Sequence, residues 1–196
     1  MFGIREYFQR RAAERAVTRE LNAKFEAIKA AMDSGDVKTV GEIAANNDFL
    51  YEQITALVLK AIDTDNVRIF NALLNGKNLQ GNPNEMLYFH YPMFEGPSVH
   101  SESSMLYLAI GSGKTNVAVA LATNPKTDIT KSGYCETATY HSGGHTERDV
   151  DPYQSPLELA RKMNMTEVVA PLAQRMAELK QREAAALLQE VRSLAP

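Results

Sequence analysis

The residues best suited to chemistry lie close together in the second half of the chain. His141 and His145 are separated by Ser-Gly-Gly, and Cys135, the single cysteine, precedes His141 by six residues. Thiolate sulfur and imidazole nitrogen are ligands that zinc takes in tetrahedral sites, and His100 is a further candidate. A zinc-binding or metal-dependent module with Cys135, His141 and His145 as candidate ligands is therefore one hypothesis, although no paired-cysteine spacing accompanies them.

Two catalytic interpretations are less well supported by the motifs around them. Cys135 could be a nucleophile if His141 or His145 took its proton, but the sequence shows no motif for an orienting acid or an oxyanion site. The segment Gly111-Ser-Gly-Lys-Thr115 resembles part of a phosphate-binding loop, yet Leu108 stands where that motif requires glycine. The sequence therefore predicts a protein that is not an enzyme and that needs no cofactor.

The composition limits the possible partners and compartments. The chain has 196 residues, a formal net charge of -3 and a hydrophobic fraction of 44%, which suit one globular domain and argue against the basic surface typical of nucleic-acid binding. A single cysteine permits no intramolecular disulfide. No apolar run is long enough for a membrane span or a secretory signal. We expect a cytoplasmic protein, or one in a host cytoplasm if it is an exported effector.

The elements that position these residues follow a repeat. Ser104–Ala122 is an apolar segment, a small-residue break and a second apolar segment, and the layout returns 51 residues later at Ser155–Ala173. Two weaker copies precede them, so the sequence predicts helix–turn–helix units at 25–44, 56–74, 104–122 and 155–173. The residues at the four breaks suit left-handed or turn conformations: Gly35, Asp65, Gly113 and Asn164.

These units resemble ankyrin repeats. Ser155-Pro-Leu-Glu158 with Ala160, Asn164 and Leu172 matches the family pattern best, and Ser104-Met-Leu-Tyr107 with Ala109 and Gly113 is next. The tetrapeptide histidine is replaced by Tyr107 and Glu158, and the spacing is wider than in the family. The resemblance implies an all-α, ankyrin-like solenoid of about four units in a single domain over 1–196. It also implies a role as an adaptor, inhibitor, immunity protein or effector; a generic helical-hairpin array is the alternative architecture.

Capping helices are expected at both ends of the array. Residues 4–32 have an apolar face at helical spacing and no proline, and residues 174–194 are rich in strong helix formers. The first helix carries five arginines among acidic residues, so solvated charges on a capping helix are one interpretation. A basic amphipathic helix on an acidic membrane surface is the other.

Two insertions, 75–103 and 124–154, separate the units and differ from them in composition. Both are far longer than ordinary helix connections and rich in aromatic residues and histidine. We expect hairpin-like fingers that bind another protein, because exposed tyrosine and phenylalanine are typical of binding hot spots. The candidate partner-binding residues are Tyr88, His90, Tyr91, Phe94, Tyr107, Tyr134, Tyr140 and His141.

Overall fold

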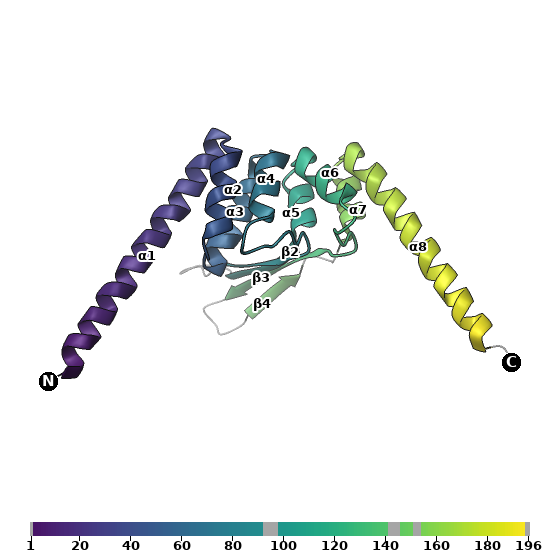
Figure 1. Cartoon of the computed structure of the whole chain (residues 1–196). Coiled ribbons are helices and arrows are strands. Elements are labelled where there is room, and N and C mark those ends of the chain that lie inside the picture. Colours follow the sequence, from purple (N-terminus) through teal and green to yellow (C-terminus); the bar gives the residue numbers. More distant parts are fainter. Residues whose placement is uncertain (1, 92–97, 141–145, 151–153, 195–196) are drawn as a thin grey trace. The chain divides into compact units, whose positions relative to one another are not determined.

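The computed structural model describes the backbone of residues 2–91, 98–140, 146–150 and 154–194. Within these ranges it describes the side chains of residues 7, 9–88, 102–133 and 154–193. The chain forms two compact units, residues 1–82 and 83–196, each considered by itself below. The described part is mostly helical (Figure 1), as the sequence predicts.

The first unit contains two helical hairpins. Its helices are α1 (Phe2–Ser34), α2 (Val37–Asn46), α3 (Tyr51–Asp63) and α4 (Val67–Leu74). Within it α1 packs on α3 and α2 on α4, so that first helices stack on first helices and second on second. Apolar residues at helical spacing are fully buried between them: Ile28, Met32, Val40, Leu57, Val58, Ile62, Ile69 and Phe70.

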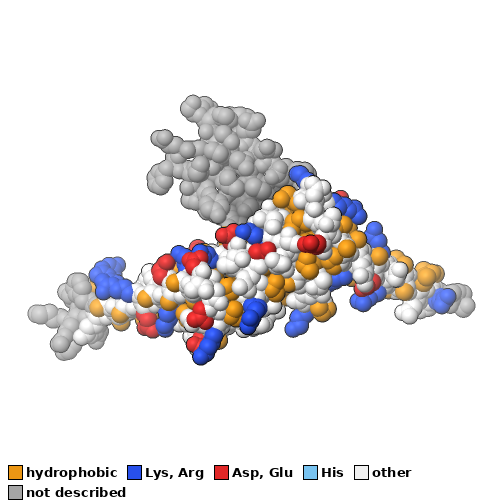
Figure 2. All heavy atoms as spheres, turned by 90° about the horizontal axis from the view of Figure 1, so that it is seen from above, with side chains coloured by type: hydrophobic (Ala, Val, Ile, Leu, Met, Phe, Trp, Pro, Cys, Tyr) orange, Lys and Arg blue, Asp and Glu red, His pale blue; other side chains and the backbone are white. Residues whose placement is uncertain are grey.

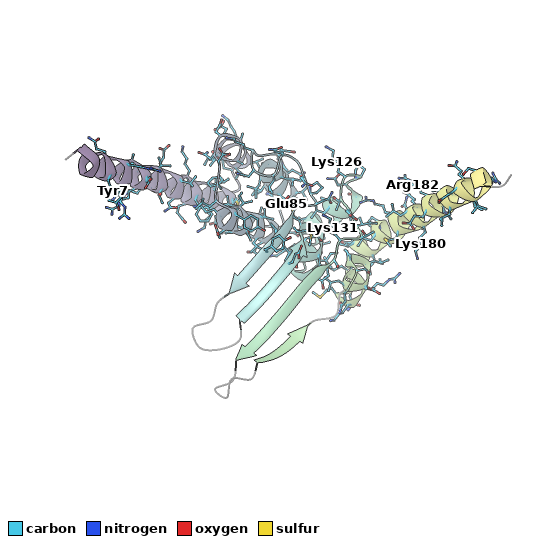
Figure 3. The ribbon with its side chains drawn as sticks, turned by 90° about the horizontal axis from the view of Figure 1, so that it is seen from below. Tyr7, Glu85, Lys126, Lys131, Lys180 and Arg182 are labelled. Carbon is cyan, nitrogen blue, oxygen red and sulfur yellow. The ribbon has the colours of Figure 1, made fainter. Side chains whose placement is uncertain are left out.

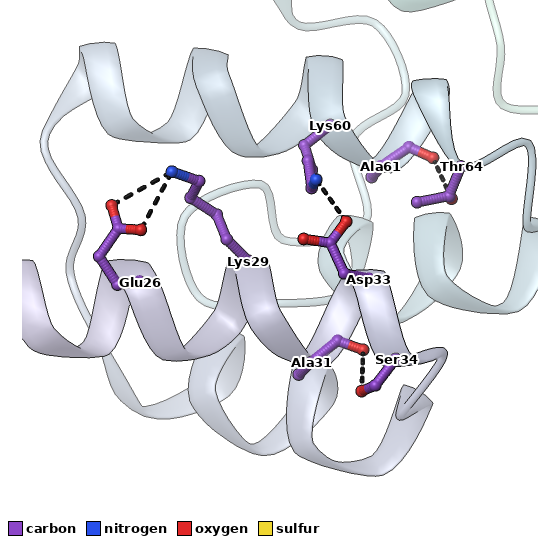
Figure 4. A network of polar contacts seen from close by, with 8 residues as sticks. All are labelled: Glu26, Lys29, Ala31, Asp33, Ser34, Lys60, Ala61 and Thr64. Atoms are coloured by element: carbon purple, nitrogen blue, oxygen red, sulfur yellow. Dashed lines mark hydrogen bonds and ion pairs between the residues drawn. The ribbon is translucent and has the colours of Figure 1, made fainter.

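Equivalent hydrogen bonds lie at the end of the first helix in each of the two hairpins of this unit (Figure 4). The Ser34 hydroxyl donates to the carbonyl of Ala31 at 3.0 Å, and the Thr64 hydroxyl donates to that of Ala61 at 2.7 Å. These bonds occupy equivalent places at the ends of α1 and α3. An ion pair between Asp33 on α1 and Lys60 on α3 connects the two hairpins at the same level.

The second unit repeats this helix arrangement and adds a sheet. Its helices are α5 (Met105–Gly111), α6 (Thr115–Thr123), α7 (Pro156–Lys162) and α8 (Thr166–Leu194). Again the first helices, α5 and α7, pack together, and so do the second helices, α6 and α8. The helix core consists of completely or almost completely buried residues: Leu106, Ile110, Val117, Ala118, Leu121, Val168 and Leu172.

The four interhelical turns share one backbone conformation. Gly35, Asp65, Gly113 and Asn164 have φ values of 76°, 51°, 67° and 55°, so the left-handed conformation predicted at the breaks is confirmed. In three of these turns, the N–H of the residue after the left-handed residue donates a hydrogen bond to the carbonyl of a buried alanine five residues earlier in the chain. Each of the four hairpins buries an alanine near the end of its first helix: Ala31, Ala61, Ala109 and Ala160.

The two insertions form one four-stranded antiparallel sheet in the order β1-β2-β3-β4. The first insertion supplies β1 (Met86–Tyr91) and β2 (Ser98–Ser104), and the second supplies β3 (Gly133–Tyr140) and β4 (Thr146–Val150). The hairpin character expected of each insertion is present in the β1–β2 and β3–β4 pairs. The pairing of β2 with β3, from Ser98–Ala138 to Ser103–Gly133, joins the two hairpins and was not anticipated from the sequence.

One further difference concerns the C-terminal end of the repeat array. The expected C-terminal helix 174–194 is not separate, because α8 runs without a break from Thr166 through Pro171 to Leu194. The N-terminal helix, expected over 4–32 and overlapping the first unit at 25–44, is present as α1 and supplies the first helix of the first hairpin. The outer parts of both helices, Gln9–Glu20 and Lys180–Ser193, are exposed at every position. The prediction of a single domain and of a continuous solenoid stays a prediction.

Gly133, the first residue of β3, allows the sheet to approach α5 closely. A Cβ atom at this position would lie 2.3 Å from the Tyr107 ring and 2.6 Å from the Ser103 hydroxyl. Tyr107 belongs to α5, and Ser103 is the β2 residue that pairs with Gly133. The absence of a side chain at residue 133 therefore sets the contact between the helix and the base of the sheet.

We predict that Gly133→Ala destabilises the chain by about 1–3 kcal/mol, because the added methyl group overlaps the Tyr107 ring. Equilibrium urea unfolding followed by circular dichroism measures this change. Gly111→Ala is the matched control, since a Cβ there meets only one side-chain atom, at 3.9 Å. Equal stability of the two variants would contradict this account of the contact.

Candidate functional site

The sheet brings most of the predicted partner-binding residues onto two strands, β1 and β3, that lie on either side of β2. Tyr88, His90 and Tyr91 lie on β1, and Tyr134 and Tyr140 lie on β3. Tyr88 pairs with Glu102 in β2, and Glu102 pairs with Tyr134 in β3, so the two tyrosines occupy one row of the register. His90 begins a second row with His100 and Glu136.

Among these five sheet residues, the structure describes the side chain of Tyr88. It is 57% exposed, while its neighbour Leu87 is fully buried. This alternation is that of a strand with one face on a core and the other in solvent. Tyr88 is therefore exposed on the solvent side of β1, and its role in partner binding stays a prediction.

The remaining candidates have other positions. Phe94 and His141 lie outside the described residues. Tyr107 lies on α5 and is half-buried, with its ring against Gly133. The structure thus gives Tyr107 a packing contact at the base of the sheet.

The zinc hypothesis stays a prediction. Cys135 lies on β3, opposite Ser101 of β2, whereas His141 and His145 lie outside the described residues. Among the residues that the structure describes, no three His, Cys, Asp or Glu side chains gather as they would around a metal ion.

Two helix caps lie at the base of the sheet. Ser104 ends β2 and caps α5: its hydroxyl accepts from the N–H of Tyr107 at 3.2 Å and donates to the Lys131 carbonyl at 2.9 Å. Gln154 forms an isolated β-bridge with Gly133. The next residue, Ser155, is the N-cap of α7: its hydroxyl accepts a hydrogen bond from the Glu158 N–H, and its own N–H donates to the Glu158 carboxylate. Because β2 runs into α5 without an intervening residue, the base of the sheet has a defined position against that helix.

A second region, absent from the sequence predictions, lies between α8 and the segment that follows α6. The Arg175 guanidinium donates to three backbone carbonyls, those of Ala122 at 2.8 Å, Asn124 at 2.9 Å and Thr127 at 2.8 Å. Three charge-assisted bonds from one planar group fix the segment against the helix. From the sequence, Arg175 is expected only as part of the C-terminal capping helix 174–194. The one sequence signal at this position is its spacing from Leu179 and Arg182, which places the three residues on one face of that helix.

Asn84 also holds this segment. Its side-chain amide donates to the Lys126 carbonyl at 2.8 Å and accepts from the Asp128 N–H at 2.6 Å. Its backbone carbonyl accepts from the Lys131 ammonium at 3.1 Å. Asn84 lies 44 residues before Asp128 in the chain. No local sequence pattern indicates such a contact.

Asp128 is held as a carboxylate in this segment. One of its oxygens accepts from the Thr130 hydroxyl at 2.6 Å and from the Thr130 N–H at 3.0 Å. The Thr130 hydroxyl is the main cause of the lowered pKa of Asp128, assisted by the Thr130 N–H and the charges of Lys131 and Arg175, while partial burial acts in the opposite direction.

The membrane alternative receives no specific support from the N-terminal helix. Arg10 pairs with Glu14 and Lys24 with Glu20 along α1, and acidic and basic side chains are interspersed on the face drawn in Figure 2. In the described part of the chain, no helix combines the length and apolarity needed to cross a bilayer.

Comparison of the chain with protein-family models, with curated proteins and with solved structures finds no match.

We predict that Arg175→Met destabilises the chain by about 2–4 kcal/mol, since three carbonyls lose their charged donor. Urea unfolding measures the change. Arg182→Met, on the same face of α8, is the control and should stay within about 0.5 kcal/mol of the wild type, because Arg182 is exposed and makes no ion pair with a described residue. Similar losses in both variants would show that the carbonyl contacts contribute little.

Asp128→Asn should reduce stability in a pH-dependent way. A carboxyl whose pKa is lower in the folded than in the unfolded chain stabilises the fold at pH values above its unfolded pKa. That contribution is lost as the pH falls through the folded pKa, below the ordinary value of 3.8. Unfolding free energies of wild type and variant should therefore differ near neutral pH and converge in acid.

The same Asp128→Asn comparison, made in a chain that also carries Thr130→Val, tests whether the Thr130 hydroxyl is the main cause of the lowered pKa of Asp128. Without the hydroxyl, the difference made by Asp128→Asn should shrink at neutral pH. An undiminished difference would assign the lowered pKa to the neighbouring charges instead.

Proposed function

We propose that the chain is a non-catalytic protein-binding module of the ankyrin-like helical-repeat type, and that its partner contacts the β1–β4 sheet. The observation that carries this proposal is the pairing of β2 with β3. It merges two insertions from different repeat units into one surface, which neither insertion would provide alone.

The helix packing within each unit supports the repeat interpretation. In both units, corresponding helices of adjacent hairpins stack on each other, and each hairpin turns through a left-handed residue. Nearest-neighbour stacking of this kind is how helical repeats bury apolar stripes that a single hairpin leaves open. Proteins built from such repeats serve as adaptors, inhibitors, immunity proteins or effectors, and we place this chain among them.

The two edges of the sheet differ in charge, and this difference favours β1 as the contact region. β4 carries Glu147, Arg148 and Asp149, whereas β1, Met-Leu-Tyr-Phe-His-Tyr, has no charged residue and no proline. Charges on an edge strand discourage the approach of another chain. Three of the six β1 residues are aromatic, the composition of interface hot spots.

The test is quantitative capture of a partner from the native host with the immobilised full chain. Tyr88→Ser should reduce the recovery of the partner about tenfold, the loss expected when a tyrosine hot spot is removed. Tyr7→Ser is the matched control, because Tyr7 is 51% exposed but lies on α1. Circular dichroism verifies that both variants keep their helices.

Equal recovery with both variants would place the contact elsewhere than Tyr88. A variant with residues 89–101 replaced by a short Gly-Ser turn then decides between the rest of the sheet and another surface. If this variant also recovers the partner, the sheet proposal is wrong.

A further inference from the structure

A hollow of about 350 Å³ lies in the second unit between α8 and the loop that follows α6. We refer to it as the α8 hollow. Its lining consists of the loop residues Pro125, Lys126, Thr127, Asp128 and Ile129 and the helix residues Arg175, Glu178, Leu179 and Arg182. The helix residues recur at i, i+3, i+4 and i+7, so one face of α8 forms one wall.

The backbone around the hollow is held before any ligand arrives. Arg175 and Asn84 both hold the loop through the hydrogen bonds described above. The N–H of Lys126 donates in addition to the Asn124 side chain at 2.9 Å. A wall fixed in this way needs little ordering when it binds a ligand.

The charged groups of the hollow differ in the hydrogen bonds and ion pairs that they make with the rest of the chain. Asp128 accepts two hydrogen bonds from Thr130, and Glu178 accepts one from Gln174 at 3.1 Å. Arg175 is committed to backbone carbonyls. The side chains of Lys126 and Arg182, in contrast, make no ion pair or hydrogen bond with any residue that the structure describes.

Lys126 and Arg182 lie on the same side of α8, whereas Lys180 lies on the other side of the helix (Figure 3). The lining also includes the apolar side chains of Pro125, Ile129 and Leu179. Apolar walls lower the local dielectric, and a charge-assisted hydrogen bond to an anion is then stronger than it is in water.

We propose that the α8 hollow binds an anionic group, a carboxylate or phosphate, through Lys126 and Arg182. The group could belong to a small metabolite or to an acidic side chain of a partner protein, and the chemistry at the two cations is the same in both cases. The site is distinct from the β1–β4 sheet and does not depend on the function proposed for that sheet.

The test is isothermal titration calorimetry of the full chain with four probes. Three are anionic, namely inorganic phosphate, succinate and the capped peptide acetyl-Glu-Leu-Glu-amide, and the fourth is its neutral counterpart acetyl-Gln-Leu-Gln-amide. At least one anionic probe should bind saturably, and the neutral peptide should not. The double variant Lys126→Gln/Arg182→Gln should raise the dissociation constant of that probe about tenfold or more.

The double variant Lys162→Gln/Lys180→Gln is the matched control, because it removes the same charge from exposed positions outside the hollow. It should bind like the wild type, and circular dichroism should show native helix content in both variants. Binding of phosphate or succinate identifies a small anion as the ligand, and binding of the acidic peptide alone identifies a partner's side chain. Equal affinities of the two double variants, or no saturable binding of any anionic probe below roughly 10 mM, would overturn the proposal.

Discussion

The pairing of β2 with β3 is the constraint on which the second unit depends. It joins segments that α5 and α6 separate in the chain, and it brings Ser103, Gly133 and Tyr107 into contact at the base of the sheet. Ser104, the next residue, is the N-cap of α5. The register of the sheet and the start of a core helix are therefore set by the same few residues, so a displacement of one requires a displacement of the other.

The parts of this structure that local chemistry determines were predictable. Gly35, Asp65, Gly113 and Asn164 adopt left-handed conformations because these residue types tolerate them best, and the apolar spacing between the turns predicts helices. The β2–β3 pairing was not predictable in this way. A strand pairing between distant segments depends on register and on closure of the intervening chain, and neither leaves a periodic signal.

The same reasoning applies to the candidate sites. Tyr88 was identified from composition, and its exposure agrees with a contact role; Tyr107 has the same residue type but packs on a glycine. Arg175 and Asn84 were missed because their partners are mainly backbone carbonyls, which every residue possesses. Side-chain patterns indicate which groups are available for binding, but they do not show which groups the fold itself engages.

The outer part of α8 has a thermal consequence. From Lys180 to Ser193 every side chain is exposed, so this segment is supported by local helix propensity alone, whereas the part from Val168 to Leu172 is anchored in the core. An unsupported helix of this length is marginal in water and loses order gradually with temperature. We therefore expect the start of α8 to unfold together with the core that it packs on, and the end of α8 to lose helical order at lower temperatures.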